Sequence, residues 1–490
     1  MSDPSHPIAV TRALAGFVHT WRWEDIPSNL RHEAKRSLMN FFAVALGGCN
    51  DSTIAKAASV LRRAGAGTAV DTAVDTAVDT AGAANPSGPA TIIGRGARSN
   101  LLDAAMLNAM CANVFDFDDT HIPTVIHPTA PVAPVLLALA QTRPAAAPLS
   151  GAQLLLAFIL GVEVECRIGN AVSPGHYQRG WHITSSCGVF GAAAAAGRAL
   201  GLSAQQLAWS FGSAANQACG LVETLGTMAK STSVGNAARN GLLSALLAQD
   251  DFTGPDAPLE GKYGFLNVTC EAPDLTGLTT QLGSRWELMA NTYKPYPCGV
   301  VLNPVIDACL KLRAALLADG ALTGTLDGAL DLAKIERINV SGHPLLRRRT
   351  DRPGVRSGRE SQVSAQHAAA ITLLTGRAGL DEFSDAAVAR ADVQALGTKL
   401  RMTDDDSITI DGVHISLTLA GGHTRSATIE HARGSLGNPL SDRDLEDKLK
   451  ELCRYGQSGC DAERLTEAVW SLDSAADAAA LMPLAAGTRR

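Results

Sequence analysis

Residues 115–132 read Phe-Asp-Phe-Asp-Asp-Thr-His-Ile-Pro-Thr-Val-Ile-His-Pro-Thr-Ala-Pro-Val, a charged stretch between long segments rich in alanine and leucine. A carboxylate beside an imidazole suits proton transfer, because it holds the ring in one tautomer and tunes its pKa. The prolines bar a regular helix across residues 121–131, so we expect a helix end followed by a structured loop. A capped loop with solvated charges is the alternative. The candidate residues are Asp116, Asp119, Thr120 and His127.

Two further polar segments lie later in the chain. Residues 180–187 precede a predicted helix and contain His182. The N–H groups at a helix start attract an anion, and His182 would lie at the rim of such a site, although it could equally cap the helix. Residues 226–241 contain Lys230 among small residues. A partly buried lysine suits carboxylate binding or acid/base work, whereas a lone lysine can also be solvated.

A fourth polar segment, Asn-Thr-Tyr-Lys-Pro-Tyr-Pro-Cys-Gly, occupies residues 291–299. Its prolines fix the backbone around Lys294. The segment is therefore either a rigid wall of a site or a linker between domains with a lysine at its surface.

The composition is that of a large globular protein, with 490 residues of which 46% are apolar and 18% charged. A chain of this length is expected to form two or three domains. The net charge of −6 argues against a nucleic-acid partner. No strongly apolar run is long enough to span a membrane, and the first residues lack a signal-peptide pattern, so we expect a cytoplasmic protein with no membrane partner. The ten cysteines have no paired close spacing and are expected to be buried thiols.

The elements that would position these segments are mostly helices. Residues 10–49 predict two amphipathic helices with a turn at residues 25–28. Further helices rich in alanine, leucine and glycine are predicted at 101–114, 131–142, 150–171, 184–200, 204–217 and 236–250. Strands are predicted at 335–341, 407–410, 413–419 and 425–431. Asp411-Gly412 would be the hairpin turn between the middle two strands, and Ser441 would cap a final helix.

This order predicts a mainly α protein, with a large all-helical domain and a smaller α/β domain. We expect the helical domain to comprise residues 1–291 and 432–490, and the α/β domain to comprise residues 292–431. The Thr-Ala-Val-Asp repeat at residues 68–80 is interpreted as a tolerated insertion in a surface loop.

Taken together, the polar segments resemble the MmgE/PrpD family. The matching motifs, in order, are Asp-Phe-Asp-Asp-Thr at 116–120 with His-Pro at 127–128, Gly-Trp-His at 180–182, Gly-Asn-Ala-Ala-Arg-Asn-Gly at 235–241 after Lys230, and Tyr-Lys-Pro-Tyr-Pro-Cys-Gly at 293–299. The resemblance covers nearly the whole chain. It includes Ile-Pro at 26–27, Phe-Ser-Asp at 383–385 and the segment 431–441.

The resemblance implies a fold and a site. The fold would be an all-helical domain with a smaller α/β lid, usually dimeric, with the active site between the two domains. No metal or other cofactor is implied, and we expect a homodimer that binds a small carboxylate. Carried over by motif, the catalytic residues would be Asp116, His127, His182 and Lys230, and the substrate-binding residues Thr120, Tyr293 and Lys294.

The resemblance also implies a reaction. We expect a cofactor-independent lyase, either a dehydratase or a decarboxylase, acting on a di- or tricarboxylate of the methylcitrate or cis-aconitate type. Its carbanion would be stabilised by the substrate carboxylate and nearby cations. The alternatives are an epimerase or isomerase for a dicarboxylate of the iminodisuccinate type and a silent member that only binds carboxylates. The Gly-Trp-His motif is similar to that of the decarboxylase branch, whereas Ser233 and Asn303 stand where many relatives have histidine.

Overall fold

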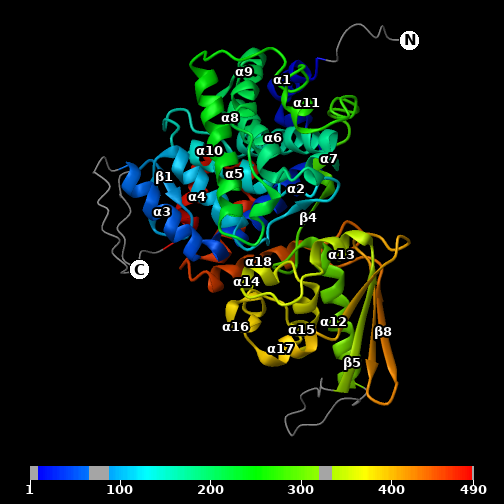
Figure 1. Ribbon diagram of the computed structural model, residues 1–490. Coiled ribbons are helices and arrows are strands. Elements are labelled where there is room, and N and C mark those ends of the chain that lie inside the picture. Colours follow the sequence, from blue (N-terminus) through cyan, green and yellow to red (C-terminus); the bar gives the residue numbers. More distant parts are fainter. Residues whose placement is uncertain (1–8, 66–87, 319–333, 488–490) are drawn as a thin grey trace. The chain divides into compact units, whose positions relative to one another are not determined.

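The structure is a computed structural model that describes residues 9–65, 88–318 and 334–487 (Figure 1). The repeat at residues 68–80 lies outside the described residues. The chain forms two compact units. The first unit comprises residues 1–114, 118–291 and 442–490, and the second comprises residues 115–117 and 292–441.

The first unit is built from helices. Those before the second unit in sequence are α1 (Val10–Thr20), α2 (Ser28–Gly48), α3 (Ser52–Gly65), α4 (Leu101–Asn113), α5 (Thr129–Ala140), α6 (Gly151–Val172), α7 (Gly175–Gln178), α8 (Ile183–Leu200), α9 (Ala204–Ala215), α10 (Ala229–Gln249) and α11 (Phe265–Thr269). Those after it are α18 (Asp442–Tyr455), α19 (Ala462–Trp470) and α20 (Leu481–Ala485). Two short antiparallel strands, β1 (Ala90–Ile92) and β2 (Ala97–Ser99), precede α4.

Helix α8 lies at the centre of the first unit, where it packs against α5, α6, α9 and α10. Glycines make this close packing possible. A Cβ atom on Gly161 of α6 would lie 2.7 Å from the carbonyl oxygen of Gly191 in α8, and one on Gly241 of α10 would lie 2.6 Å from that of Val189. The small-residue composition of these helices therefore brings their backbones close to the middle of α8.

The second unit contains a four-stranded sheet in the order β6-β5-β7-β8. Its strands are β5 (Ile335–Gly342), β6 (Leu400–Asp404), β7 (Val413–Leu419) and β8 (Thr424–Ile429). Strand β6 is parallel to β5, and the other pairings are antiparallel. Alternate residues of β7 are buried, and α12 (Asn303–Ala318) packs against β7 and β8 in Figure 1. The other helices are α13 (Pro344–Thr350), α14 (Gly358–Ser361), α15 (Ala365–Thr375), α16 (Asp385–Val388) and α17 (Ala391–Gly397).

The mainly α fold with a smaller α/β part is confirmed, but the predicted hairpin is wrong. Residues 407–410 form no strand, and Asp411-Gly412 is not a hairpin turn. The hairpin instead joins β7 to β8 through Gly421 and Gly422, both of which have a positive φ that suits glycine. Strand β6 was not predicted.

Two helix starts also differ from the prediction. Helix α5 begins at Thr129, within the stretch that the prolines were expected to keep irregular. Pro131 lies in the first turn of α5, where N–H groups lack an acceptor within the helix, so a proline is tolerated there. Helix α10 begins at Ala229 rather than near residue 236, which places Lys230 in its first turn.

Candidate active site

His127 lies in the loop between α4 and α5, and the residue is 7% exposed. Its Nδ1 lies 2.7 Å from the backbone oxygen of Asp119 and 3.3 Å from Oγ1 of Thr120. A carbonyl oxygen can only accept, so Nδ1 is the protonated nitrogen of the ring. The nitrogen that gains and loses a proton is therefore Nε2, as a general acid or base requires.

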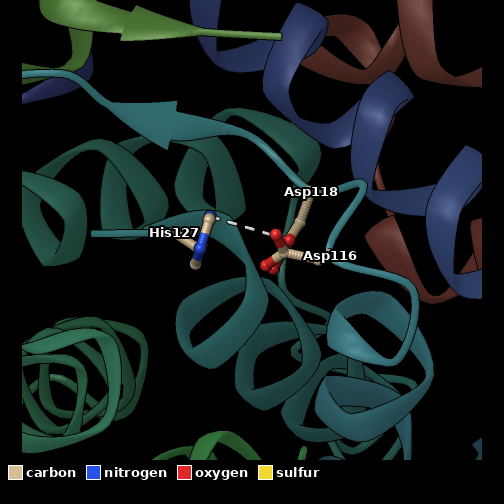
Figure 2. A group of neighbouring side chains, drawn as sticks. All are labelled: Asp116, Asp118 and His127. Carbon is tan, nitrogen blue, oxygen red and sulfur yellow. Dashed lines mark ion pairs between the residues drawn. The ribbon is translucent and has the colours of Figure 1, made fainter. Parts of the chain in front are cut away.

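Asp118 is the carboxylate beside this imidazole within the first unit. Its Oδ1 lies 3.6 Å from Nδ1 of His127, and Figure 2 marks this ion pair with a dashed line. Its Oδ2 accepts a hydrogen bond of 2.7 Å from Asn113 at the end of α4. Oδ1 is buried and has no hydrogen-bond partner among the described residues, so its negative charge is available to stabilise a protonated ring. Asp118 was not among the residues predicted from the sequence motifs.

The backbone of this loop is strained. Val125 has a φ of 62°, a conformation that β-branched residues rarely adopt and that costs on the order of 1–3 kcal/mol. Local hydrogen bonds hold it in place: the N–H of Val125 donates to the carbonyl of His121, and the N–H of His121 donates to that of Ile126, both at 2.8 Å. The loop therefore presents His127 on a fixed backbone.

A buried polar network supports the loop from α6. Nδ1 of His121 contacts Oγ1 of Thr124 at 2.8 Å, and its Nε2 contacts Glu287 at 3.1 Å. Burial alone would raise the pKa of Glu287, but the hydrogen bond and charge of His121 lower it to about 2. Glu163 of α6 accepts from the N–H of Glu287 and from the wholly buried Arg167. Arg167 also donates to the carbonyl oxygens of Gly277, Leu278, Thr280, Gln281 and Arg285.

Asp119 is a wholly buried carboxyl group next to the residue that pairs with His127. Burial raises its pKa to about 7, despite hydrogen bonds from Thr129 and Asn291 that favour the charged form. Its pKa in the folded protein is therefore well above the ordinary aspartate value of 3.8. Its contribution to stability is therefore complete below pH 4 and is lost as the pH rises to about 7. The loss is on the order of 4 kcal/mol.

We expect Asp119→Asn to flatten the pH dependence of stability. Between pH 5 and pH 8 the wild type should lose more of its free energy of unfolding than the variant, because only the wild type must ionise a buried acid. Denaturant unfolding at both pH values measures the difference. Asp250→Asn, which removes an exposed carboxylate, should behave as the wild type. Equal losses in the wild type and Asp119→Asn would contradict the raised pKa.

His182 and Lys230 lie at the N-termini of two long helices in the same unit. His182 is the N-cap of α8, and Lys230 is the second residue of α10 with an exposed fraction of 8%. The N–H of His182 donates to the carbonyl of Gly220 in the segment that leads to α10. The N–H of His127 donates to Oγ1 of Thr184 in the first turn of α8. Helix N-termini and a buried cation together favour an anion.

The second unit contains the other predicted side chains. Lys294 is 1% exposed, and its Nζ donates to the backbone oxygen of Asp116 at 2.7 Å and lies 3.4 Å from Oδ2 of Asp116. Tyr293 is also buried, and Gly434 leaves room for it, since a Cβ there would lie 2.3 Å from the carbonyl oxygen of Tyr293. Tyr296 donates to Asp307 at 2.6 Å, which anchors the same segment. Each unit thus positions a part of the predicted set.

Ser233 and Asn303, where the resemblance implies histidine, both form local hydrogen bonds. Oγ of Ser233 donates to the backbone oxygen of Lys230 at 2.8 Å, within the first turns of α10. Asn303 is the buried first residue of α12, and its side-chain oxygen accepts from the thiol of Cys298. All ten cysteines are free thiols, as predicted, and eight of them are buried, whereas Cys219 is exposed and Cys460 is half-buried.

Comparison with known proteins decides the family. Residues 64–277 match the MmgE/PrpD N-terminal domain, and residues 296–474 match the MmgE/PrpD C-terminal domain. The chain belongs to the MmgE/PrpD family.

Three similar proteins are named cis-aconitate decarboxylase. Human cis-aconitate decarboxylase is 29% identical over 390 residues, which cover 78% of this chain and 79% of that protein. The mouse cis-aconitate decarboxylase is 30% identical over 366 residues and 72% of each chain. That of Aspergillus terreus is 26% identical over 419 residues, or 81% of this chain and 84% of the relative. These relatives support a lyase of the MmgE/PrpD family. Within the described ranges, no helix is both long and apolar enough to cross a membrane.

Proposed function

We propose that this member of the MmgE/PrpD family is a decarboxylase of a small tricarboxylate of the cis-aconitate type and that it needs no cofactor. The names of its relatives support decarboxylation. The observation that carries the proposal is the imidazole of His127, whose Nδ1 is committed to a backbone carbonyl and flanked by the carboxylate of Asp118. A ring held in this way can deliver a proton from Nε2, and the carboxylate of Asp118 stabilises its positive charge.

The proposed reaction has two steps. The bond between a carboxylate and the adjacent carbon breaks, CO₂ leaves, and the electron pair remains on that carbon. The resulting carbanion spreads its charge onto a remaining carboxylate of the substrate. Protonated His127 then transfers the proton on Nε2 to the carbanion, and the neutral ring takes up a proton from solvent before the next turnover.

The positive groups of the chain would stabilise the developing charge. Lys230 and the N-terminus of α10 attract a substrate carboxylate, and His182 does the same at the N-terminus of α8. We assign Lys294, Thr120 and Tyr293 to substrate binding. Asp116, which neighbours Lys294, is assigned to holding that ammonium group in position.

One experiment on the purified protein separates the candidate reactions. A panel of carboxylates, including cis-aconitate, methylcitrate and iminodisuccinate, is followed in deuterated water by NMR with a parallel measurement of released CO₂. Decarboxylation releases CO₂ and places one deuterium in the product. Dehydration releases no CO₂, and epimerisation exchanges a proton without a leaving group. Turnover by either of these routes alone would overturn the proposal, and binding without turnover would indicate a silent member.

We expect full activity after exhaustive chelation of divalent ions. Asp116, Asp118 and His127 carry atoms that could hold a metal ion. The ammonium group of Lys294, however, already places a positive charge beside Asp116. Turnover of the best substrate is measured before and after treatment with EDTA. Activity that disappears with the chelator and returns with one added divalent ion would show that the reaction needs a metal.

A further inference from the structure

A cavity of about 300 Å³ lies where α6 begins and α8 ends in the first unit. It is lined by two arginines, Arg143 and Arg198, by Gln153 of α6, and by the apolar side chains of Leu149, Leu156 and Leu200. A second hollow of about 460 Å³ shares Gln153, Leu156 and Arg198 with it. None of the candidate catalytic residues lines either space.

Arg143 is the unusual member of this lining. Its Nε is buried and has no hydrogen-bond partner, and its guanidinium group forms no ion pair with a described residue. A buried donor without a partner costs about 1–3 kcal/mol, and more when the group is charged. Arg198 differs, because its two terminal nitrogens donate to the carbonyl oxygens of His19 and Trp21. Those carbonyls accept from its terminal nitrogens but are neutral, and Arg198 forms no ion pair with a described residue.

The cavity therefore has positive charge at one part of its wall and leucine side chains at another. We infer that it binds a small organic carboxylate with a short apolar tail. The planar guanidinium group of Arg143 would pair with the carboxylate, since its fork of donors matches two oxygens. Leu149, Leu156 and Leu200 would cover the tail. The volume is at the lower end of the roughly 300–1,000 Å³ typical of ligand pockets, so a small molecule fits and a folded segment does not.

This ligand site lies away from the candidate catalytic groups and does not depend on the proposed function. Helix α8 has His182 as its N-cap and Leu200 as its last residue. Its 18 residues span about 27 Å. The cavity and His182 therefore lie at opposite ends of one helix. A carboxylate bound beside Arg143 could not touch the groups around His182.

Binding of hexanoate to the full-length protein, measured by isothermal titration calorimetry, tests the inference. Arg143→Met keeps the apolar stem of the side chain but removes the guanidinium group, so the dissociation constant should rise at least tenfold. Leu200→Asp places a negative charge on another part of the lining. It should also raise the dissociation constant, because it repels the carboxylate. The matched control is Arg62→Met, which removes an exposed arginine from α3 and should bind hexanoate as the wild type does. The melting temperature of each variant shows whether it is folded.

Lys230→Met distinguishes this cavity from the candidate active site. It should leave hexanoate binding unchanged, and hexanol, which has the tail without the charge, should bind weakly to the wild type and to each variant.

The inference fails if hexanoate shows no saturable binding to the wild type, or if it binds to folded Arg143→Met and Leu200→Asp as tightly as to the wild type. It also fails if binding depends on Lys230 instead of Arg143. Binding of inorganic phosphate in place of hexanoate would show an anion site without the apolar part, and dissociation of an oligomer by Arg143→Met would show that a second copy fills the space.

Discussion

His127→Gln should lower kcat by about 10²–10⁴ on the substrate that the wild type decarboxylates, and the variant should remain folded. Glutamine has a similar size and can donate a hydrogen bond to the carbonyl of Asp119, but it cannot gain and lose a proton near neutral pH. The variant therefore retains a hydrogen-bonding side chain of similar size and loses the transferable proton on Nε2. KM should change much less than kcat, because the proposed role of His127 is confined to the proton transfer.

Steady-state kinetics and a melting curve measure both parts of this prediction. His423→Gln is the matched control, since His423 is exposed in the turn between β7 and β8 and should tolerate the change. The pH profile adds a second readout: the limb that reports the imidazole in the wild type should be absent from the residual activity of His127→Gln. If the folded variant turns over at the rate of the wild type, the acid/base assignment moves to His182.

Lys230→Met should lower kcat/KM by about 10²–10³, with a higher KM as well as a lower kcat. The ammonium group would attract the substrate carboxylate and also stabilise the carbanion, so its loss affects binding and chemistry together. The same substitution should not destabilise the protein. A buried cation in the first turn of α10 lies at the positive end of the helix dipole, and its removal relieves that repulsion.

The diagnostic result is thus a loss of activity with an equal or higher melting temperature. Lys56→Met, on the exposed face of α3, removes the same charge at the surface and should change neither quantity. Unchanged kinetics in a folded Lys230→Met would exclude Lys230 from the site. A large fall in melting temperature would instead indicate that Lys230 has a structural role.

The helical part of the fold was predictable because the apolar period of its long helices is clear in the sequence. The errors occurred where that period is absent. Residues 229–235 read Ala-Lys-Ser-Thr-Ser-Val-Gly, which resembles a loop, yet they form the first turns of α10 because the neighbouring helices pack against it. Residues 407–410 alternate like a strand, but β7 pairs instead with β8 and with β5 (Ile335–Gly342), which is distant in the sequence.

The candidate site shows a similar division. Residue types and their order along the chain were enough to select His127 and the lysines, but they could not show which of three neighbouring carboxyl groups would lie beside the ring. That choice depends on backbone torsions, among them the positive φ of Asp116, and on the position of Asn113 at the end of α4. The sequence also gives no sign that the backbone carbonyl of Asp119 would fix the tautomer of His127.

Arg167 has a consequence for the mutational tolerance of this chain. Its single guanidinium group binds five backbone carbonyls of residues 277–285, a segment without regular secondary structure, and also the carboxylate that holds Glu287 beside the strained loop. Lysine has fewer donors in a different geometry and cannot replace that fork. In a library of random variants, position 167 should therefore be among the least permissive positions outside the site. Substitutions of Arg167 should reduce the yield of soluble protein, whereas substitutions of His127 should give normal amounts of inactive protein.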